Sequence, residues 1–434
     1  MPDGLVVTLA VVVLGVLIAL RAPVFVALGA SGMLGLYLLN GLTGLEQIPI
    51  SLVDQLQNFS LVAAPMYILM GEILSVSGLG RDLFKAAHHW LGRMPGSLGA
   101  SAIGASTVFG AMSGVSISSV AVVGRMSVPE MLDRGYKPSF ASGSVTASGA
   151  LAMLIPPSLM FILYSSVTGV SIAALFAGGI VPGLILSAMM IAYVVTAAKL
   201  RPSLAPPPAE RFTWAMRLRA LARVVPALVL ILLVLGSMYT GLATPTEAAA
   251  VGALGAMLVV GVFYRALSWA NLRKALVATT QVSGAVLAIV GSAYIFTQML
   301  VVVRIPELVT SFVAGLAVPP YLVMFGVMLI MVFLGCLVDA ASLLLVVTPI
   351  LVPAMSGLGF DPLWLGVLLV VNLEMAVITP PVGLNLYTMK SVVPELDLAE
   401  IFRGIMPYLF IEVALLAVMI AVPGIATWLP GLIA

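Results

Sequence analysis

Charge is scarce in this 434-residue chain. Charged residues make up 8% of it, while hydrophobic residues make up 62%. So few charges cannot cover the surface of a soluble domain of this length. Unbroken apolar runs such as 323–333 lack the alternation of a barrel strand, and several runs reach the roughly 20 residues that a helix needs to cross a bilayer. The sequence therefore predicts an all-α polytopic membrane protein.

Other absences exclude several chemistries. The single cysteine, Cys336, cannot form an intramolecular disulfide and has no metal-ligating companions. A net charge of +2 gives no reason to expect a nucleic acid partner, and no GxxxxGK[ST] motif indicates an ATPase. Residues 5–20 read as a first span rather than a cleavable signal peptide, and no catalytic constellation of His and Asp is visible. We therefore expect a protein that is not an enzyme and that, if it transports, uses a gradient.

The two halves of the chain resemble one another. A shift of 224 residues lays residues 109–157 on residues 333–381 without a gap. Every proline of the first window then meets a proline of the second: Pro129 meets Pro353, Pro138 meets Pro362, and Pro156-Pro157 meets Pro380-Pro381. An apolar background explains matched Val and Ala but not matched prolines. We predict two repeats, over 1–199 and 224–434, joined by a basic, proline-containing connector over 200–223.

Each predicted repeat contains a hairpin and a broken helix. The hairpins cover 96–132 and 319–355, and the broken helices cover 138–168 and 361–393 around the Pro-Pro pairs. If both hairpins are re-entrant, each half crosses the membrane five times and the second half is inverted. With the N-terminus outside, this arrangement places 18 of the 19 Lys and Arg residues on the cytoplasmic side and leaves Arg304 outside. The positive-inside rule thus favours about ten spans in an inverted repeat with two re-entrant hairpins.

Paired breaks in inverted repeats are typical of a transport site at the membrane midplane. Pro156-Pro157 and Pro380-Pro381 remove backbone donors and force the preceding residue out of the α region. Each break frees carbonyls for a cation, while the half-helix that follows presents a positive N-terminal end to an anion. A simple proline kink is the alternative, but two pairs at equivalent places favour a site.

The predicted hairpin tips, 110–119 and 335–342, supply small residues and hydroxyls. Either these let the backbone approach a ligand such as Na⁺, or they serve helix packing, which is common in membranes. Asp339 stands at the second tip as a cation ligand or as a helix cap, and the cost of a carboxylate at membrane depth favours the ligand. Glu374 either binds a cation or proton or locks the broken helix, and we favour the lock.

Three further residues are weaker candidates. Arg125, on the cytoplasmic arm of the first hairpin, either attracts an anion or snorkels, and snorkelling is favoured. His88 and His89 lie on an amphipathic segment, 79–93, without a ligand set beside them. We expect both histidines to be solvated or lipid-facing.

Several stretches resemble the large membrane subunit of TRAP (tripartite ATP-independent periplasmic) transporters, in the wider ion-transporter superfamily. The most specific are Thr244-Pro245-Thr246-Glu247-Ala248 and Thr379-Pro380-Pro381-Val382-Gly383. Others are Val128-Pro129-Glu130-Met131, Ile155-Pro156-Pro157-Ser158, Gly179-Ile180-Val181-Pro182-Gly183, Leu337-Val338-Asp339 and Asn372-Leu373-Glu374. The resemblance covers nearly the whole chain, although an uncharged residue is usual in the family near Arg125.

The resemblance implies a Na⁺-coupled elevator, in which both hairpins and both broken helices slide against a scaffold of the remaining spans. It implies a multi-pass protein of the bacterial inner membrane whose partners are the lipid bilayer, a small four-helix membrane subunit and a periplasmic binding protein. That protein would deliver a small organic acid such as a C4-dicarboxylate or sialic acid. The alternative is a stand-alone dicarboxylate or Na⁺/H⁺ carrier of the same superfamily.

By matching motifs, the resemblance also implies site residues. The expected Na⁺ ligands are Ser113, Gly114, Ser116 and Pro156 in the first half, and Asp339, Ser342, Thr379 and Pro380 in the second. The expected substrate contacts are Ser118, Ser158, Gly383 and Asn385.

Overall fold

The computed structural model of the protein describes residues 2–46, 48–207, 210, 212–316, 318–381 and 383–433. Within these ranges all regular structure is helical and no strand occurs, so the predicted all-α class is confirmed. Pro208, Arg211 and Val382, which belong to the predicted connector and to the second Pro-Pro motif, lie outside the described residues.

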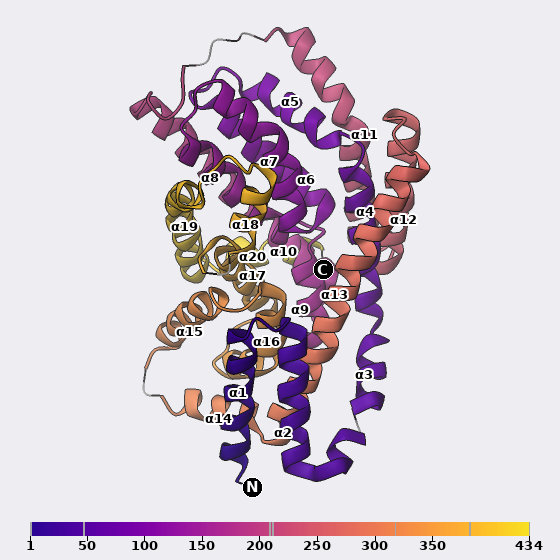
Figure 1. Ribbon diagram of the computed structural model, residues 1–434, viewed down its shortest axis with the longest axis vertical. Helices are drawn as coiled ribbons and strands as arrows, with labels where there is room; N and C mark the ends of the chain where they lie inside the picture. Colours follow the sequence, from indigo (N-terminus) through magenta and orange to yellow (C-terminus); the bar gives the residue numbers. More distant parts are fainter. Residues whose placement is uncertain are drawn as a thin grey trace.

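The first half begins with a helical pair and ends with a long helix (Figure 1). Its elements are α1 (Asp3–Ala19), α2 (Val24–Glu46), α3 (Ile48–Leu56), α4 (Phe59–Ser75), α5 (Leu79–Leu91), α6 (Ser97–Ser113), α7 (Ser116–Asp133), α8 (Pro138–Ser148), the 3₁₀ helix η1 (Gly149–Met153), α9 (Leu159–Thr168) and α10 (Ile172–Leu200). The α2 helix is kinked at Gly41.

The second half begins at α11, after the connector. Its elements are α11 (Trp214–Tyr239), α12 (Pro245–Leu258), the π-helix η2 (Val259–Phe263), α13 (Trp269–Val302), α14 (Ile305–Ala314), α15 (Pro320–Gly335), α16 (Ala340–Gly357), α17 (Pro362–Ile378), α18 (Leu384–Val392), α19 (Leu398–Ala421), α20 (Gly424–Thr427) and α21 (Pro430–Ile433). Figure 1 shows α5, α6 and α7 in the upper part of the molecule and α14, α15 and α16 in the lower part.

The helices form two packed groups. In the first, α4 packs against α12 and α13, and α13 packs against α2. In the second, the helix after each break packs on the hairpin of the other half, α18 on α7 and α9 on α16. We name these the α4 group (α1–α4 and α11–α13) and the hairpin group (α6–α10 and α15–α19).

The long helices α10 and α19 belong to the hairpin group. Although we expected the spans outside the hairpins and breaks to form the scaffold, α10 packs on α6 and α17, and α19 packs on α8 and α17. Their contacts therefore place them with the hairpins. The reason is that small residues on these helices let them approach the broken helices closely, as at Gly143 and Gly404, where the backbones touch.

Six helices in the described residues are long and apolar enough to cross a membrane, and a seventh span results if α4 and α5, bent by 70°, are taken together. The six include α16, which we expected to be a hairpin arm. The shorter apolar helices Asp3–Ala19 and Val24–Asn40 fall below the length limit. Multiple membrane spans are thus present.

Several boundaries differ from those expected from hydropathy. Residues 214–223, predicted as connector, form the first turns of α11. The α13 helix begins at Trp269, nine residues before residue 278, where hydropathy indicated the start of this span. Charged residues such as Arg217 and Arg219 continue the helix where an apolar window ends. The short helices α3, α20 and α21 were not predicted.

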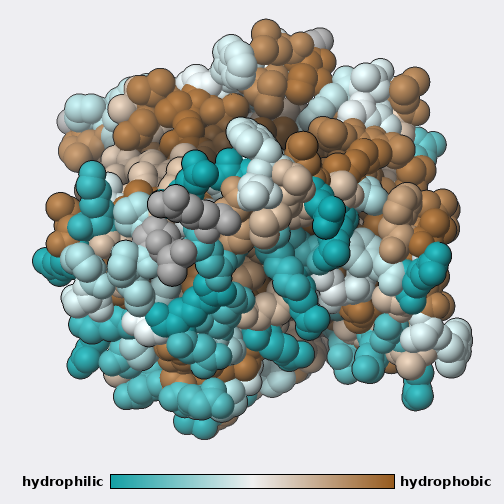
Figure 2. Space-filling view, turned by 90° about the horizontal axis from the view of Figure 1, so that it is seen from above, coloured by the Kyte–Doolittle hydropathy of each residue, from teal (hydrophilic) through white to brown (hydrophobic). Residues whose placement is uncertain are grey.

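Hydrophilic residues gather at one end of the molecule. Figure 2 views the upper end of Figure 1 and shows hydrophilic side chains over much of this face, with hydrophobic ones along one side. The α5 helix lies at this end (Figure 1). This distribution is what a protein presents where it leaves the bilayer.

Candidate functional site

The first hairpin tip touches the first helix break. Gly114 ends α6 in the left-handed region, with a φ of +62°, and Val115 leads directly into α7. A Cβ atom on Gly114 would lie 2.6 Å from the Pro157 carbonyl oxygen, and the Leu159 amide donates a 3.4 Å hydrogen bond to the Gly114 carbonyl. The structure therefore brings Gly114, predicted as a ligand, into contact with the break beside Pro156.

The second tip has a similar construction with a carboxylate. Asp339 is the N-cap of α16, and its Oδ1 accepts a 3.0 Å hydrogen bond from the Ser342 amide. Near the break, Thr379 Oγ1 donates to the Met375 carbonyl at 2.5 Å. Asp339 is thus a helix cap, which is one of its two predicted roles. Its Oδ2 is buried without a hydrogen-bond partner in the described residues.

Several buried oxygens around the tips and breaks have no hydrogen-bond partner among the described residues. They are the side-chain oxygens of Ser113, Ser119, Thr146, Ser342 and Thr348, together with Oδ1 of Asn385. Buried polar groups normally have partners, so each such oxygen requires an explanation. Hydroxyl, carbonyl and carboxylate oxygens are hard ligands, which fit an alkali cation. No group of three or more His, Cys, Asp or Glu that could hold a metal occurs in the part of the chain described.

The four residues predicted to contact substrate have different surroundings. Ser118 Oγ donates a 3.1 Å hydrogen bond to Oε1 of Glu72, on α4. Ser158 is buried, and its hydroxyl donates to the Met153 carbonyl, so it binds the backbone on the other side of the first break. Asn385 Nδ2 donates to the Thr146 carbonyl at 3.4 Å, across the two halves. Gly383 begins α18 with a φ of +27°.

Glu72 was not identified from the sequence. It lies inside a predicted span, so the argument that singled out Asp339 applies to it equally. The hydrogen bond to Ser118 joins the α4 group to the hairpin group, as does the 3.1 Å bond that Asn58 Nδ2 donates to the Ser166 carbonyl.

The predicted surroundings of His88 are wrong. Its side chain is 8% exposed, its Nε2 lies 3.3 Å from Oε2 of Glu210 in the connector, and Phe212 packs edge-on against its ring. Burial lowers the pKa of His88 below its usual value of 6.5, against the opposing effect of Glu210. Arg134 at the end of α7 binds the same Glu210 at 2.7 Å. The connector thus folds back onto α5 and α7. Arg125, by contrast, is exposed.

The predicted lock by Glu374 is also not found. Its side chain is fully buried on α17, yet neither carboxyl oxygen has a hydrogen-bond partner among the described residues. The Asn372 amide beside it donates to the Met328 carbonyl of α15 at 2.8 Å. The backbone freed at the second break therefore takes no bond from Glu374.

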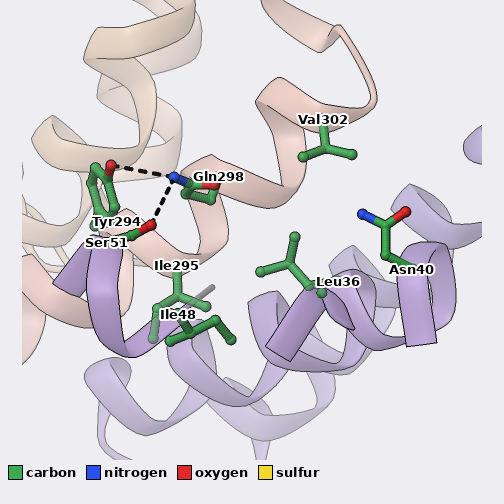
Figure 3. A pocket seen from close by; sticks show the side chains of 9 residues that line it. Leu36, Asn40, Ile48, Ser51, Tyr294, Ile295, Gln298 and Val302 are labelled. Carbon is green, nitrogen blue, oxygen red and sulfur yellow. Dashed lines mark hydrogen bonds between the residues drawn. The ribbon is translucent and has the colours of Figure 1, made fainter. Parts of the chain in front are cut away.

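Two pockets lie beside α13. One, between α2, α3 and α13, contains a small polar group in which Gln298 Nε2 donates to Tyr294 Oη at 3.3 Å and to Ser51 Oγ at 3.5 Å (Figure 3). It includes none of the predicted site residues. The other lies where the two helix groups meet and is lined by Ser166 of α9, Thr297 of α13 and Leu345 of α16, among others.

Comparison with known proteins identifies the family. Residues 11–425 match the family model "Tripartite ATP-independent periplasmic transporter, DctM component". The chain is 31% identical to the C4-dicarboxylate TRAP transporter large permease protein DctM of Pseudomonas aeruginosa, over 93% of this chain and 94% of that protein. It is 30% identical to the sialic acid TRAP transporter large permease protein SiaM of Vibrio cholerae, over 89% of this chain and 90% of that protein.

Two solved membrane transporters share the fold. The YdaH transporter of Alcanivorax borkumensis matches with a TM-score of 0.61 at 17% identity and covers 88% of this chain and 89% of its own. MtrF of Neisseria gonorrhoeae matches with a TM-score of 0.57 at 16% identity, over 88% of this chain and 84% of its own. At these identities the likeness concerns the fold alone. Because the family model spans nearly the whole sequence, the chain belongs to the DctM family, the large permease component of TRAP transporters.

Proposed function

We propose that this chain is the permease of a Na⁺-coupled importer of small organic acids, which a periplasmic binding protein delivers. The observation that carries the proposal is the contact between each hairpin tip and a broken helix, exemplified by Gly114 against Pro157. Carboxylates such as C4-dicarboxylates or sialic acid are the proposed substrates, since relatives named for these substrates align over almost their full length.

The inverted repeat is part of the proposal. Helices of the two halves correspond under the same shift of 224 residues, because α7 (Ser116–Asp133) maps onto α16 (Ala340–Gly357) and α9 maps onto α18. The first hairpin also lies in the upper part of the molecule and the second in the lower part (Figure 1). Both features support ten crossings with re-entrant hairpins, with α8–α9 and α17–α18 each counted as one broken span.

We place two Na⁺ sites at the hairpin tips. The first would combine Ser113, Gly114 and Ser116 with carbonyls at Pro156, and the second would combine Asp339 and Ser342 with Thr379 and Pro380. Buried hydroxyls of Ser113 and Ser342 that lack partners in the described residues support these assignments. Na⁺ would replace its hydration shell with these oxygens and neutralise Asp339, whose Oδ2 is otherwise unpaired.

Substrate would bind where the N-terminal ends of α9 and α18 point, near Ser118, Ser158, Gly383 and Asn385. Short helices in this place present backbone amides to a carboxylate. Ser158 is already bonded to the Met153 carbonyl, so we assign it to the shape of the break, whereas Asn385 retains a free Oδ1.

Movement of the hairpin group along the α4 group completes the proposed cycle. In the described residues, two side-chain hydrogen bonds, Ser118–Glu72 and Asn58–Ser166, join the two groups. Few polar bonds would therefore break during an elevator step. A small four-helix membrane subunit would brace the α4 group in the bacterial inner membrane. A related protein that joins both components in one chain, an isethionate TRAP permease named DctMQ, supports this pairing.

The decisive experiment is uptake in liposomes that contain this chain, the small subunit and the loaded binding protein. We expect uptake that requires an inward Na⁺ gradient and that Asp339→Asn abolishes or frees from Na⁺. Asparagine still caps a helix, so the substitution removes the charge and preserves α16. Asp361→Asn is the matched control, because Asp361 caps α17 in the same way, accepting a 2.9 Å bond from the Trp364 amide.

Two outcomes would contradict the proposal. Full uptake without Na⁺, driven by a proton gradient, would remove Na⁺ coupling. Full uptake by the purified chain alone would remove the partners and favour a stand-alone dicarboxylate or Na⁺/H⁺ carrier.

A further inference from the structure

Two glutamates on different helices are buried inside the hairpin group. Glu374 is on α17 and Glu412 is on α19, helices that pack together (Figure 1). Both residues are 0% exposed, and Glu412 is near enough to Glu374 to act on it electrostatically. Neither belongs to the hairpin tips or breaks that form the proposed Na⁺ sites.

All four carboxyl oxygens of this pair lack a hydrogen-bond donor in the described residues. The four ion pairs found there involve His88, Arg134 and Arg223, not these glutamates. A carboxylate that is buried without a donor or cation is among the most costly arrangements in a protein interior. Two such groups near one another in a buried environment strongly disfavour being charged at the same time.

Titratable groups on the helices packed against α17 and α19 have other partners or lie outside. Tyr164 Oη donates to the Pro362 carbonyl, and the Tyr193 ring packs edge-on against Tyr408. Lys390 donates to the Pro394 and Leu396 carbonyls. The remaining titratable side chains on these helices and their caps include ones that are exposed or half-buried: Lys199, Tyr321, Cys336, Asp339, Asp361, Tyr387, Glu400 and Arg403. The Tyr408 hydroxyl, one turn before Glu412, is buried without a partner in the described residues.

We propose that Glu374 and Glu412 form a proton-binding site within the membrane, and that the site is occupied in this conformation. A proton from water adds to a carboxylate oxygen of one glutamate, and the resulting O–H donates to a carboxyl oxygen of the other. This removes one charge and satisfies two of the unpaired oxygens. The proposal does not depend on Na⁺ coupling or on the binding protein.

A proton fits this place better than a metal cation. Na⁺ needs several oxygen ligands, but the residues next to the pair in sequence, such as Met375 and Val413, are apolar. These two residues also line an apolar pocket between α15, α17 and α19. This apolar lining offers no polar group to a chain of water, so the proton would leave through a movement of α15 or α19.

Infrared spectroscopy on the purified chain in lipid tests the proposal without any transport assay. The carbonyl stretch of a protonated carboxylic acid, assigned by its shift in D₂O, should be present at neutral pH. Glu374→Gln and Glu412→Gln should each shift this band in frequency, because the remaining acid changes its hydrogen-bond partner, and the double variant should lose the contribution of the pair. Glutamine has nearly the shape of a protonated glutamate, so the variants should fold. Glu400→Gln, at the polar end of α19, is the control and should leave the band unchanged.

An absence of any band that the double variant removes would overturn the proposal, as would equal loss of the band in Glu400→Gln. If the double variant does not fold, the single variants decide: a shift in the frequency of the band in either supports the site, and an unchanged band in both refutes it. Failure of Na⁺-driven uptake in every variant, including the unmodified protein, would count against the proposed function and leave this spectroscopic result standing.

Discussion

A methyl group added at the first hairpin tip tests whether the tip and the break form one site. Gly114→Ala places a Cβ 2.6 Å from the Pro157 carbonyl oxygen, closer than real contacts allow, at a residue whose φ is +62°. The hairpin or the break must therefore shift. Since both supply carbonyls to the proposed first Na⁺ site, the shift should weaken Na⁺ binding as well as the fold.

The expected magnitude has two parts. An L residue in the left-handed region costs roughly 1–2 kcal/mol. Overlap in a well-packed interior adds about 1–3 kcal/mol. Gly169 provides a matched comparison, because it ends α9 with a φ of +72° and nothing lies within 4 Å of its would-be Cβ. Gly169→Ala should therefore cost only the first part.

Thermal unfolding in lipid nanodiscs, with and without Na⁺, separates these effects. A ligand that binds the native state raises its stability, and by more when it binds more tightly. We expect Gly114→Ala to unfold at a lower temperature than Gly169→Ala and to gain less from Na⁺. Equal losses in the two variants would show that the overlap is relieved at no cost. A full Na⁺ response in Gly114→Ala would refute the placement of the first site at this tip.

Two other predictions concern contacts outside the tips. Ser118→Ala removes the bond to Glu72, worth about 1 kcal/mol, so the equilibrium should move roughly fivefold away from this conformation. Distances between spin labels on α4 and α7 measure this equilibrium, and Ser119→Ala is the control. An identical distribution of distances in the two variants would contradict the prediction. The pKa of His88 is lowered by burial, so the docked connector is stabilised above the unfolded value of about 6.5 and loses this contribution as pH falls below it. The rate of proteolysis of the connector should therefore increase in acid in the unmodified protein and in His89→Gln, but not in His88→Gln. A similar increase in His88→Gln, or no increase in His89→Gln, would refute the prediction.

Local features of the fold could be predicted from the sequence because their causes are local. A Pro-Pro pair breaks a helix wherever it stands, and both breaks occur at the expected residues, between η1 and α9 and between α17 and α18. Glycine and serine between apolar arms likewise mark the turn at Gly114. The end of a helix that extends past the apolar region has no such marker, which is why α11 and α13 begin earlier than expected.

Tertiary contacts could not be predicted in the same way. That His88 is buried depends on Phe212 and Glu210, which lie more than 120 residues later and return across α5. Glu72 and Glu412 were within reach of the sequence argument, since each stands in an apolar run as Glu374 does. Their partners, however, come from other helices, so the sequence could not pair Glu72 with Ser118 or Glu412 with Glu374.

The contacts within the hairpin group also decide which helices can move together. A Cβ on Gly143 of α8 would lie 2.2 Å from the Gly404 carbonyl oxygen, and one on Gly404 of α19 would lie 2.0 Å from the Ser139 carbonyl oxygen. The two backbones therefore touch, and neither helix can slide past the other without separating first. The α19 helix also carries Glu412, which is buried near Glu374 of α17. Separation of α19 from α17 would therefore uncover two buried carboxyl groups. The proposed elevator step would then carry α8, α17 and α19 as one body, with the proposed proton inside it. This body would slide along α4, where two side-chain hydrogen bonds cross between the described residues.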